Sequence, residues 1–393
     1  MFSDRTNWKL TRNRFTKAWE QVRAAGKEVL DLTLSNPTRA GFDYDQAAIL
    51  GALSSPRAMD YDPQSKGLLE ARQAVSGYYG EQQATTELNP EQLILTTSTS
   101  EGYSYVFRLL CNPGDEVLIP KPSYPLFEFL GDLQDVKLVP YPLIYDHGWQ
   151  IDFPSMPKAV SPLTRAVVVV HPNNPTGSYL KPDERDTLNR FCAEHGLALV
   201  GDEVFLDYAH DGRSRPSLAL NREVLTFTLS GLSKVSALPQ MKVAWMVASG
   251  PKAQWRDAVA RLEVIADTYL SMNGPIQWAV PILLEQRKSM QKQLLDRVLA
   301  NLAELDRQLA ARKSCQRLGV EGGWYAVLRV PVTGSDEDLT IELLRSKSVL
   351  VHPGHFYDFP GEGHLVLSLI GPKAEFAEGI RRVLEIVDGG RRI

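Results

Sequence analysis

The sequence predicts an α/β fold: a large domain with a mainly parallel sheet flanked by helices, and a smaller α+β domain. Three observations support this prediction. Short apolar runs alternate with amphipathic helical patterns through the first two thirds of the chain, which is typical of a parallel sheet with crossover helices. From about residue 282 a long charged helix and short strands follow instead. The length of 393 residues also exceeds that of one simple core.

The change of pattern predicts the domain boundaries. We expect residues 45–280 to form the large domain, and residues 1–44 with 281–393 to form the small domain. The assignment of the N-terminal segment to the small domain is an expectation that the sequence alone does not show.

The early elements follow from spacing and turn residues. Residues 67–79 carry apolar side chains at helical spacing, and residues 93–97 form a short apolar and β-branched run. We therefore expect a helix and then a strand. Residues 100–110 and 124–133 read as further helices, with a strand at 116–119 between them.

Three later runs predict buried parallel strands, because they are apolar on both faces. They are residues 165–170 (RAVVVV), 197–200 (LALV) and 225–229 (LTFTL). Helical patterns lie between them at residues 184–195 and, less clearly, at 217–223.

The last third predicts a different architecture. Residues 285–313 read as one long amphipathic helix, and a terminal helix covers 373–387. Short strands are expected between them, at residues 324–330, 349–352 and 365–369.

Composition excludes several classes of function. A net charge of −4 argues against a nucleic-acid groove. The three cysteines, Cys111, Cys192 and Cys315, form no C-x-x-C pair, so neither a metal site nor a disulfide framework is predicted. The chain starts without an apolar signal segment, and no run reaches the roughly 18 apolar residues of a membrane span. We expect a cytoplasmic protein that binds neither nucleic acid nor membrane.

Polar residues directly follow four of the predicted strands. They are residues 97–100, 171–177, 201–203 and 230–234. If the sheet is parallel, all four sets meet at one edge, where ligands of such sheets bind.

The chemistry of these residues points to pyridoxal 5′-phosphate (PLP). A lysine at a buried strand end, such as Lys234, loses its charge easily and can form a Schiff base with an aldehyde. Asp202 on the neighbouring strand could keep a pyridine nitrogen protonated. The helix start at Thr99 and Ser100 could bind a phosphate through free amides, and the Asn174 amide could donate to a phenolate oxygen.

Each residue alone has a more ordinary interpretation. An isolated lysine is usually a surface residue, an aspartate after a strand is usually a turn or cap residue, and Asn-Pro is usually a turn. Tyr124 alone reads as a core aromatic residue. The order and spacing of the set carry the prediction.

These residues resemble motifs of the class I/II aminotransferases, a PLP-dependent family of fold type I that includes aspartate aminotransferase. The run Asn173–Gly177 (NNPTG) resembles the family's N-N-P-T-G, which implies that Asn174 contacts the cofactor's ring oxygen. The pair Asp202-Glu203 resembles D-E, so Asp202 would bind the ring nitrogen. The run SGLSK at 230–234 resembles S-x-L-S-K, which implies that Lys234 is the Schiff-base lysine and places Ser230 and Ser233 in the cofactor site.

Weaker matches to the family's motifs add further residues to the implied site. Tyr61 lies in a stretch that resembles Y-x-P-x-x-G, whose tyrosine reaches the phosphate of the neighbouring subunit, so the resemblance implies a homodimer. Residues 267–277 are expected at the same interface. Residues 97–102 resemble the phosphate-binding segment, with Thr99 and Ser100, and Tyr124 would stack on the ring. Asn36 lies where the family's N-terminal loop approaches the substrate.

Three positions depart from the family pattern. Phe205 stands where a tyrosine commonly donates to the ring oxygen, and Lys242 where an arginine commonly binds the phosphate. Lysine keeps that charge without the bidentate fork. Val366 stands where the family places the arginine that binds the substrate carboxylate. Arg39 is a candidate replacement, with His355 and Lys373 as weaker ones.

The expected activity is amino-group transfer from an amino acid or amine to a 2-oxo acid, by a ping-pong mechanism. Lys234 would move the Cα proton as a general base while Asp202 supports the ring charge. A PLP-dependent lyase or decarboxylase on the same fold is the alternative, since site details choose the chemistry, and a non-catalytic PLP-binding regulator is a minor one. A nicotinamide dehydrogenase is disfavoured because no G-x-G-x-x-G occurs.

Overall fold

The apolar runs of the first two thirds of the chain form the predicted sheet. The computed structural model describes residues 1–83, 88–270, 272–310 and 312–389, so the predicted segments 267–277, 281–393 and 285–313 each include residues outside this range. Within the described ranges the large sheet has eight strands in the order β2-β9-β8-β7-β6-β3-β4-β5. Their bounds are β2 (Leu93–Thr96), β3 (Glu116–Lys121), β4 (Lys137–Tyr145), β5 (Trp149–Ile151), β6 (Thr164–Val170), β7 (Ala198–Asp202), β8 (Thr226–Gly231) and β9 (Ala244–Ser249).

The sheet is mainly parallel, as predicted. β4, β3, β6, β7 and β8 pair in parallel. β9 is antiparallel to both of its neighbours, β2 and β8. β2 therefore runs in the same direction as β8, and the ends of β2, β6, β7 and β8 share one edge.

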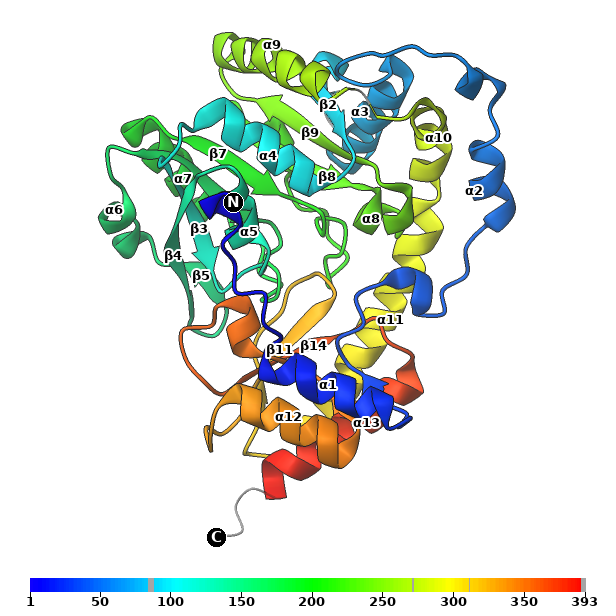
Figure 1. Ribbon diagram of the computed structural model, residues 1–393, viewed down its shortest axis with the longest axis vertical. Coiled ribbons are helices and arrows are strands. Elements are labelled where there is room, and N and C mark those ends of the chain that lie inside the picture. Colours follow the sequence, from blue (N-terminus) through cyan, green and yellow to red (C-terminus); the bar gives the residue numbers. More distant parts are fainter. Residues whose placement is uncertain (84–87, 271, 311, 390–393) are drawn as a thin grey trace.

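Helices cover both faces of this sheet (Figure 1). One face packs on α4 (Thr99–Leu110) and α9 (Lys252–Thr268), through apolar side chains such as Val168, Phe227 and Met246. The other face packs on α7 (Pro182–His195), and on α3 (Leu69–Gln83) and α10 (Gly274–Glu285) at the end of the sheet that carries β2 and β9. Shorter helices are α2 (Gln46–Ala52), α5 (Phe127–Leu133), α6 (Met156–Ala159) and α8 (Leu232–Val235).

The last third forms a second sheet with its own helices, drawn below the large sheet in Figure 1. Its strand order is β10-β11-β14-β13, all antiparallel pairs. The bounds are β10 (Gln316–Arg317), β11 (Tyr325–Arg329), β13 (His352–Pro353) and β14 (His364–Ser368). Around them lie α1 (Arg14–Ala24), α11 (Arg287–Leu309), α12 (Asp336–Lys347) and α13 (Lys373–Gly389). The α/β plus α+β fold class is thus confirmed.

The N-terminal segment packs with this part of the chain. β1 (Leu30–Asp31) pairs in parallel with β12 (Val349–Leu350). Leu32 and Ala40 belong to a core that consists mainly of residues from the last third. The exact domain boundaries stay a prediction, because α10 runs across residue 280.

Three expected elements were wrong in detail. Residues 217–223 form only a short 3-10 turn, η6 (Leu218–Leu220), because the Ser217 hydroxyl caps it and Asn221 leaves the helical conformation. The long helix expected at 285–313 is present as α11 but starts only at Arg287, because Glu285 is the last residue of α10. The strand at 349–352 is split, because β12 pairs with β1 whereas β13 pairs with β14.

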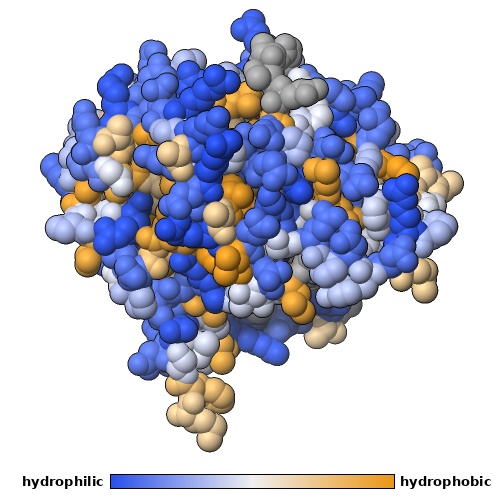
Figure 2. Space-filling view, turned by 90° about the horizontal axis from the view of Figure 1, so that it is seen from above, coloured by the Kyte–Doolittle hydropathy of each residue, from blue (hydrophilic) through white to orange (hydrophobic). Residues whose placement is uncertain are grey.

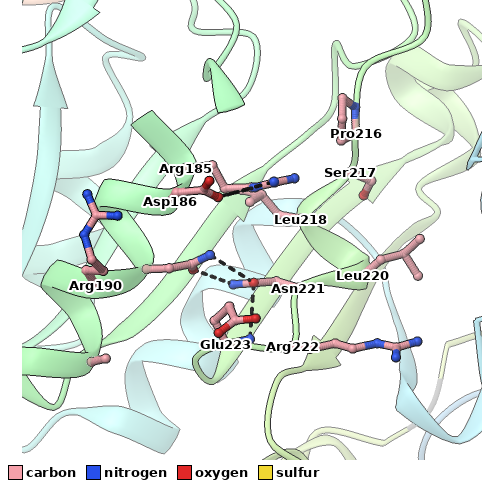
Figure 3. A pocket seen from close by; sticks show the side chains of 12 residues that line it. Arg185, Asp186, Arg190, Pro216, Ser217, Leu218, Leu220, Asn221, Arg222 and Glu223 are labelled. Carbon is pink, nitrogen blue, oxygen red and sulfur yellow. Dashed lines mark hydrogen bonds and ion pairs between the residues drawn. The ribbon is translucent and has the colours of Figure 1, made fainter. Parts of the chain in front are cut away.

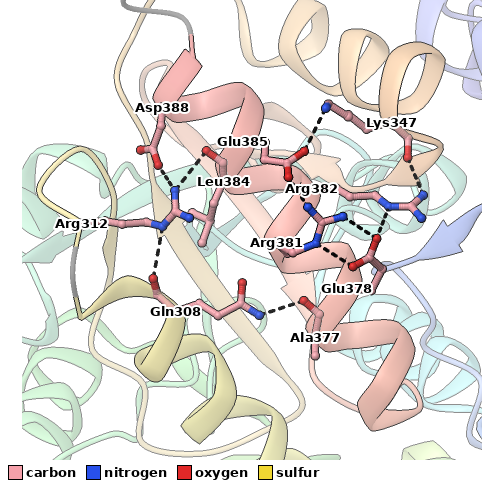
Figure 4. A network of polar contacts seen from close by, with 10 residues as sticks. All are labelled: Gln308, Arg312, Lys347, Ala377, Glu378, Arg381, Arg382, Leu384, Glu385 and Asp388. Atoms are coloured by element: carbon pink, nitrogen blue, oxygen red, sulfur yellow. Dashed lines mark hydrogen bonds and ion pairs between the residues drawn. The ribbon is translucent and has the colours of Figure 1, made fainter.

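Charged contacts tie α13 to its neighbours (Figure 4). Lys347 Nζ lies 2.9 Å from Glu385, and Arg382 donates to the Lys347 carbonyl at 2.9 Å. Gln308 of α11 donates to the Ala377 carbonyl at 2.8 Å. Exposed ion pairs contribute little each, so the buried core between these helices holds them in place.

The surface is mainly hydrophilic in the view from above, with apolar residues in small groups between charged ones (Figure 2). Scattered exposed apolar residues are normal on soluble proteins. None of the helices in the described part of the chain is long and apolar enough to cross a membrane.

Candidate active site

The predicted site residues come together at the carboxyl edge of the large sheet. Register pairs align β6, β7 and β8, so that Val170 lies beside Asp202 and Asp202 beside Leu229. The segments that follow these strands carry Asn174, Asp202 and Lys234. β2 ends at the same edge, where α4 begins.

Lys234 lies on the short helix α8, which directly follows β8. Its Nζ atom is 4.9 Å from the ring centroid of Trp324 and 5.6 Å from that of Phe205. Burial beside these rings lowers the pKa of Lys234 to about 8, and the nearby Asp202 charge opposes this shift. About a tenth of the amine is therefore neutral at pH 7, far more than for a lysine of ordinary pKa, and the neutral form is the nucleophile.

Asp202 ends β7 and is 8% exposed. One carboxylate oxygen accepts from the Tyr103 hydroxyl at 3.0 Å, and the other from the Val204 amide at 3.2 Å. Burial raises the pKa of Asp202 to about 6, and these two hydrogen bonds and Lys234 limit the rise. The carboxylate is therefore a fixed anion at neutral pH.

The loop after β6 gives its two asparagines different roles. Asn173 holds the loop together, because its carbonyl accepts from the Thr176 hydroxyl at 2.9 Å and its amide donates to the Pro122 carbonyl at 3.3 Å. Asn174 is buried, yet its Oδ1 atom has no hydrogen-bond partner in the described residues. A buried amide without a partner is costly, so this side chain has hydrogen-bonding capacity for a ligand.

Gly177 completes the same loop. Its φ is +69°, and a Cβ there would lie 2.4 Å from the Gly322 carbonyl oxygen. The Gly322 amide also donates to the Gly177 carbonyl at 3.0 Å. Only glycine fits this close approach between the loop and the segment that leads to β11.

The first turn of α4 presents free amides. Ser98 caps the helix: its hydroxyl accepts from the Glu101 amide at 3.2 Å, and its carbonyl from the Gly102 amide at 3.1 Å. The Glu101 carboxylate in turn accepts from the Thr97 amide at 2.6 Å. The Thr99 and Ser100 amides are the remaining donors of this turn, and helix geometry offers them no intrahelical partner.

Lys242 lies two residues before β9, whose first residue Ala244 is opposite Thr96 at the end of β2. Its φ is +52° and its side chain is exposed. Its role toward a phosphate stays a prediction.

Two serines of the SGLSK run differ in environment. Ser230 is buried, and its hydroxyl donates to the Glu203 carbonyl at 3.5 Å. Ser233, next to Lys234, is half-buried. Ser230 therefore has a structural contact, and the role of both hydroxyls toward a cofactor stays a prediction.

Two aromatic residues border the site. Tyr124 follows β3, is 37% exposed and packs edge-on against Phe127. Burial and the Asp202 charge raise the pKa of Tyr124, so the phenol lies within electrostatic reach of Asp202. Phe205 is buried 5.1 Å from the Trp324 ring and has no polar atom to offer.

The remaining predicted residues lie further from Lys234. Tyr61 is 84% exposed on the surface of this chain. Asn36 and Arg39 are exposed on a loop, where the Asn36 side chain accepts from the Thr38 amide at 3.1 Å. Val366 is buried in β14. His355 and Lys373 are exposed.

Sequence reasoning missed two residues of this site. The Tyr103 hydroxyl donates to the Asp202 carboxylate at 3.0 Å, and the Tyr208 hydroxyl donates to the Lys234 carbonyl at 2.6 Å. Nothing in the sequence shows where a buried tyrosine hydroxyl points, so only the structure identifies these two contacts.

A separate surface groove between α7 and η6 contains none of the predicted residues (Figure 3). Arg190, Arg222 and Glu223 extend around it, and the Asn221 side-chain amide donates to Asn189 at 2.9 Å. Its polar groups are charged and exposed or paired with each other. The groove therefore offers no counterpart to the lysine, carboxylate and amide at the sheet edge.

Comparisons with known proteins agree with this geometry. A sequence model of the family "Aminotransferase class I and II" matches residues 28–383. The chain is 28% identical to an alanine aminotransferase of Mycobacterium tuberculosis over 375 residues, covering 92% of this chain and 86% of that protein. It is 30% identical to the glutamate-pyruvate aminotransferase AlaA of Escherichia coli K12 over 270 residues, covering 68% of this chain and 66% of that protein.

Solved structures show the same fold. An aminotransferase from Escherichia coli superposes with a TM-score of 0.88 at 24% identity, covering 100% of this chain and 99% of that chain. An alanine aminotransferase from Pyrococcus furiosus also superposes with a TM-score of 0.88, at 22% identity, covering 99% of this chain and 100% of that chain.

Proposed function

This chain belongs to the aminotransferase class I and II family and is an enzyme that transfers amino groups, and we propose that it does so with PLP bound at Lys234. One observation carries the proposal: a lysine amine with a lowered pKa lies at the same sheet edge as a fixed carboxylate, Asp202. Members of this family use PLP in general.

The residues at the sheet edge fit this cofactor. Asp202 would bind the ring nitrogen, and the Nδ2 group of Asn174 would donate to the ring oxygen. The Thr99 and Ser100 amides would hold the phosphate, with Lys242 adding charge. Tyr124 would cover the ring. Phe205 offers no donor, so Asn174 alone would serve the ring oxygen.

The residues of this chain have separate roles in the proposed reaction. When bound, PLP supplies an electron sink for the charge that develops at Cα. Lys234 would hold the cofactor through its side-chain amine and, when that amine is free, would move the proton from Cα as a general base. Asp202 would hold a proton on the ring nitrogen, and Tyr103 and Val204 keep its carboxylate in place.

The substrates would be an amino donor and a 2-oxo acid acceptor that use the site in turn. Asn36 and Arg39 lie on the loop that we assign to the substrate side. We also propose a homodimer in which Tyr61 reaches the partner's phosphate, which would give its exposed side chain a role. A cytoplasmic location is proposed from the sequence alone.

Absorption spectroscopy tests this function. Purified protein is mixed with PLP, and the visible band of lysine-bound cofactor is recorded for the wild type, for Lys234→Ala and for the surface control Lys158→Ala. We expect the band in the wild type and the control only. Amino acids and amines are then screened for loss of the band together with formation of the keto product.

Two outcomes would contradict the proposal. A wild-type protein without the band does not hold the cofactor at Lys234. Release of pyruvate or carbon dioxide while the lysine-bound band returns, without an acceptor, indicates a lyase or a decarboxylase instead of a transaminase.

A further inference from the structure

The helix that carries Lys234 is short and is held from outside. α8 has only four residues, and a helix of this length is not stable alone. The last carbonyls of a helix also lack partners within it. Side chains from three distant segments donate to carbonyls of this region: the Tyr208 hydroxyl to Lys234 at 2.6 Å, the Gln291 amide to Val235 at 2.9 Å and the Tyr44 hydroxyl to Ala237 at 2.9 Å. The backbone position of Lys234 therefore depends on residues outside α8.

Tyr208 connects the backbone of Lys234 to both rings that border its amine. The Tyr208 ring is fully buried and packs edge-on against Trp324, with 5.2 Å between the ring centroids. Its amide donates to the Phe205 carbonyl at 3.0 Å, and its carbonyl accepts from the amide of Gly323, the residue before Trp324, at 3.0 Å. One residue thus fixes the start of the lysine side chain and the surroundings of its amine.

Gln291 is fixed in turn by Asp207, the neighbour of Tyr208 in the chain. The Asp207 carboxylate accepts from the Tyr78 hydroxyl at 3.0 Å and from the Gln82 amide at 2.8 Å, and it also bonds the Gln291 side chain. Because an ionised carboxylate only accepts, the Gln291 amide donates both to it and to Val235. An amide with both contacts has one orientation, so α11 holds α8 through a fixed side chain.

We infer that Tyr208 is a positioning residue for Lys234 and that Gln291 assists it, because both hold the backbone of α8 and so keep the lysine amine beside Trp324 and Phe205. This inference rests on the proposed function, in which that amine holds the cofactor and moves the Cα proton. A lysine side chain is a flexible four-carbon stem, so a fixed backbone and fixed neighbouring rings are needed to keep its amine in one place.

Competitive labelling of the cofactor-free protein tests the position of the amine without turnover. A trace of acetic anhydride reacts with neutral amines, and mass spectrometry compares Lys234 with the exposed Lys158 from pH 6 to pH 10. In the wild type the labelling midpoint of Lys234 should lie near its pKa of about 8. Asp202, the charge that acts on this amine, is unchanged in the variants. In Tyr208→Phe the amine should be more open to water, so we expect a midpoint about half a unit to one unit higher.

Tyr141→Phe is the matched control. Tyr141 is buried like Tyr208, and its hydroxyl also donates to a backbone carbonyl, that of Val168 in β6 at 2.7 Å. Both variants lose a hydroxyl of the same kind, so Tm should fall by a similar amount in each. Only Tyr208→Phe should shift the labelling midpoint of Lys234. Gln291→Met, which keeps the side-chain length but removes the amide, should give a smaller shift in the same direction.

Turnover of the PLP-loaded enzyme gives a second readout. A displaced Lys234 amine should slow proton transfer and leave donor binding nearly unchanged. With the donor found in the screen, we expect Tyr208→Phe to lower kcat about tenfold while KM stays within about threefold of the wild type. Deuterium at Cα of the donor should then produce a larger isotope effect on kcat than in the wild type or in Tyr141→Phe.

The outcomes separate the two proposals. If Tyr208→Phe and Gln291→Met give the labelling midpoint and the isotope effect of Tyr141→Phe, the positioning role is wrong, while the aminotransferase proposal stands. If the wild type never forms the lysine-bound cofactor, the proposed function fails, and labelling of the cofactor-free protein still tests the contacts around Lys234. If Tyr208→Phe does not fold, Gln291→Met decides the role of these contacts.

Discussion

The two walls of the candidate site differ in how their charges are arranged. The large-sheet edge gathers Lys234 and Asp202 from neighbouring strands, and each side chain shifts the pKa of the other toward its charged form. Tyr325 and Val366 of the small sheet carry no charge. The difference teaches that the charged groups of the candidate site come from the strand ends of the large sheet, while these two residues of the small sheet add only uncharged side chains.

Replacement of Asp202, the anion at the large-sheet edge, should lower kcat more than any other substitution discussed below. In Asp202→Asn the ring nitrogen loses its counter-charge while the side-chain volume stays the same. We expect kcat to fall by roughly 10³-fold, as for other electrostatic groups of active sites. Steady-state kinetics measure this, with the exposed Asp186→Asn as the control. A fall of less than tenfold would mean that the charge at the large-sheet edge is not needed.

The lowered pKa of Lys234 predicts a pH dependence for cofactor attachment. The neutral amine attacks the aldehyde, and its fraction rises with pH until the pKa of about 8 is passed. Between pH 6 and pH 8 the rate of PLP attachment to the cofactor-free protein should rise about 50-fold and then level off. Stopped-flow absorption measures it. A rate that keeps rising tenfold per pH unit up to pH 10 would show an ordinary lysine.

The large-sheet edge could be predicted from the sequence because its signals are local. β6, β7 and β8 are continuous apolar runs, and the polar residues that follow them are adjacent in sequence. The antiparallel β9 was not predicted, since an apolar run does not reveal its direction. The 217–223 helix failed because Asn221 is extended, with its side chain bonded to Asn189 and Thr226, which are tertiary contacts.

The side-chain contacts around Lys234 and Asp202 could not be predicted, because they join segments that are distant in sequence. Trp324 reaches Lys234 across 90 positions of sequence. Tyr103 reaches Asp202 from a helix whose aromatic residues read as core. A burial pattern shows that a tyrosine is inside the protein, but it does not show where the hydroxyl points.

Tyr103 offers a smaller test of the large-sheet edge. Tyr103→Phe removes one donor to the Asp202 carboxylate, so the pKa of Asp202 should rise further and its anion should be held less firmly. We expect kcat to fall about tenfold, with the lower limb of the pH–rate profile moved to higher pH. Tyr141→Phe is the control, because that hydroxyl donates to the Val168 carbonyl at 2.7 Å and serves stability. Equal kcat values in the two variants would contradict a positioning role for Tyr103.

Phe205 gives the smallest and most specific test, because it lies between the two walls. Its ring lies 6.2 Å from the ring of Tyr325 in β11 of the small sheet, and it borders the Lys234 amine. Phe205→Tyr would add a hydroxyl that can donate to the ring oxygen beside Asn174. That donor stabilises the deprotonated form of the lysine-linked cofactor, so the midpoint of its spectral pH titration should fall by about one unit. Turnover should change by less than about tenfold, since Asn174 already serves that oxygen. An unchanged midpoint would place residue 205 outside contact with the ring oxygen, and would assign it to the substrate side of the site.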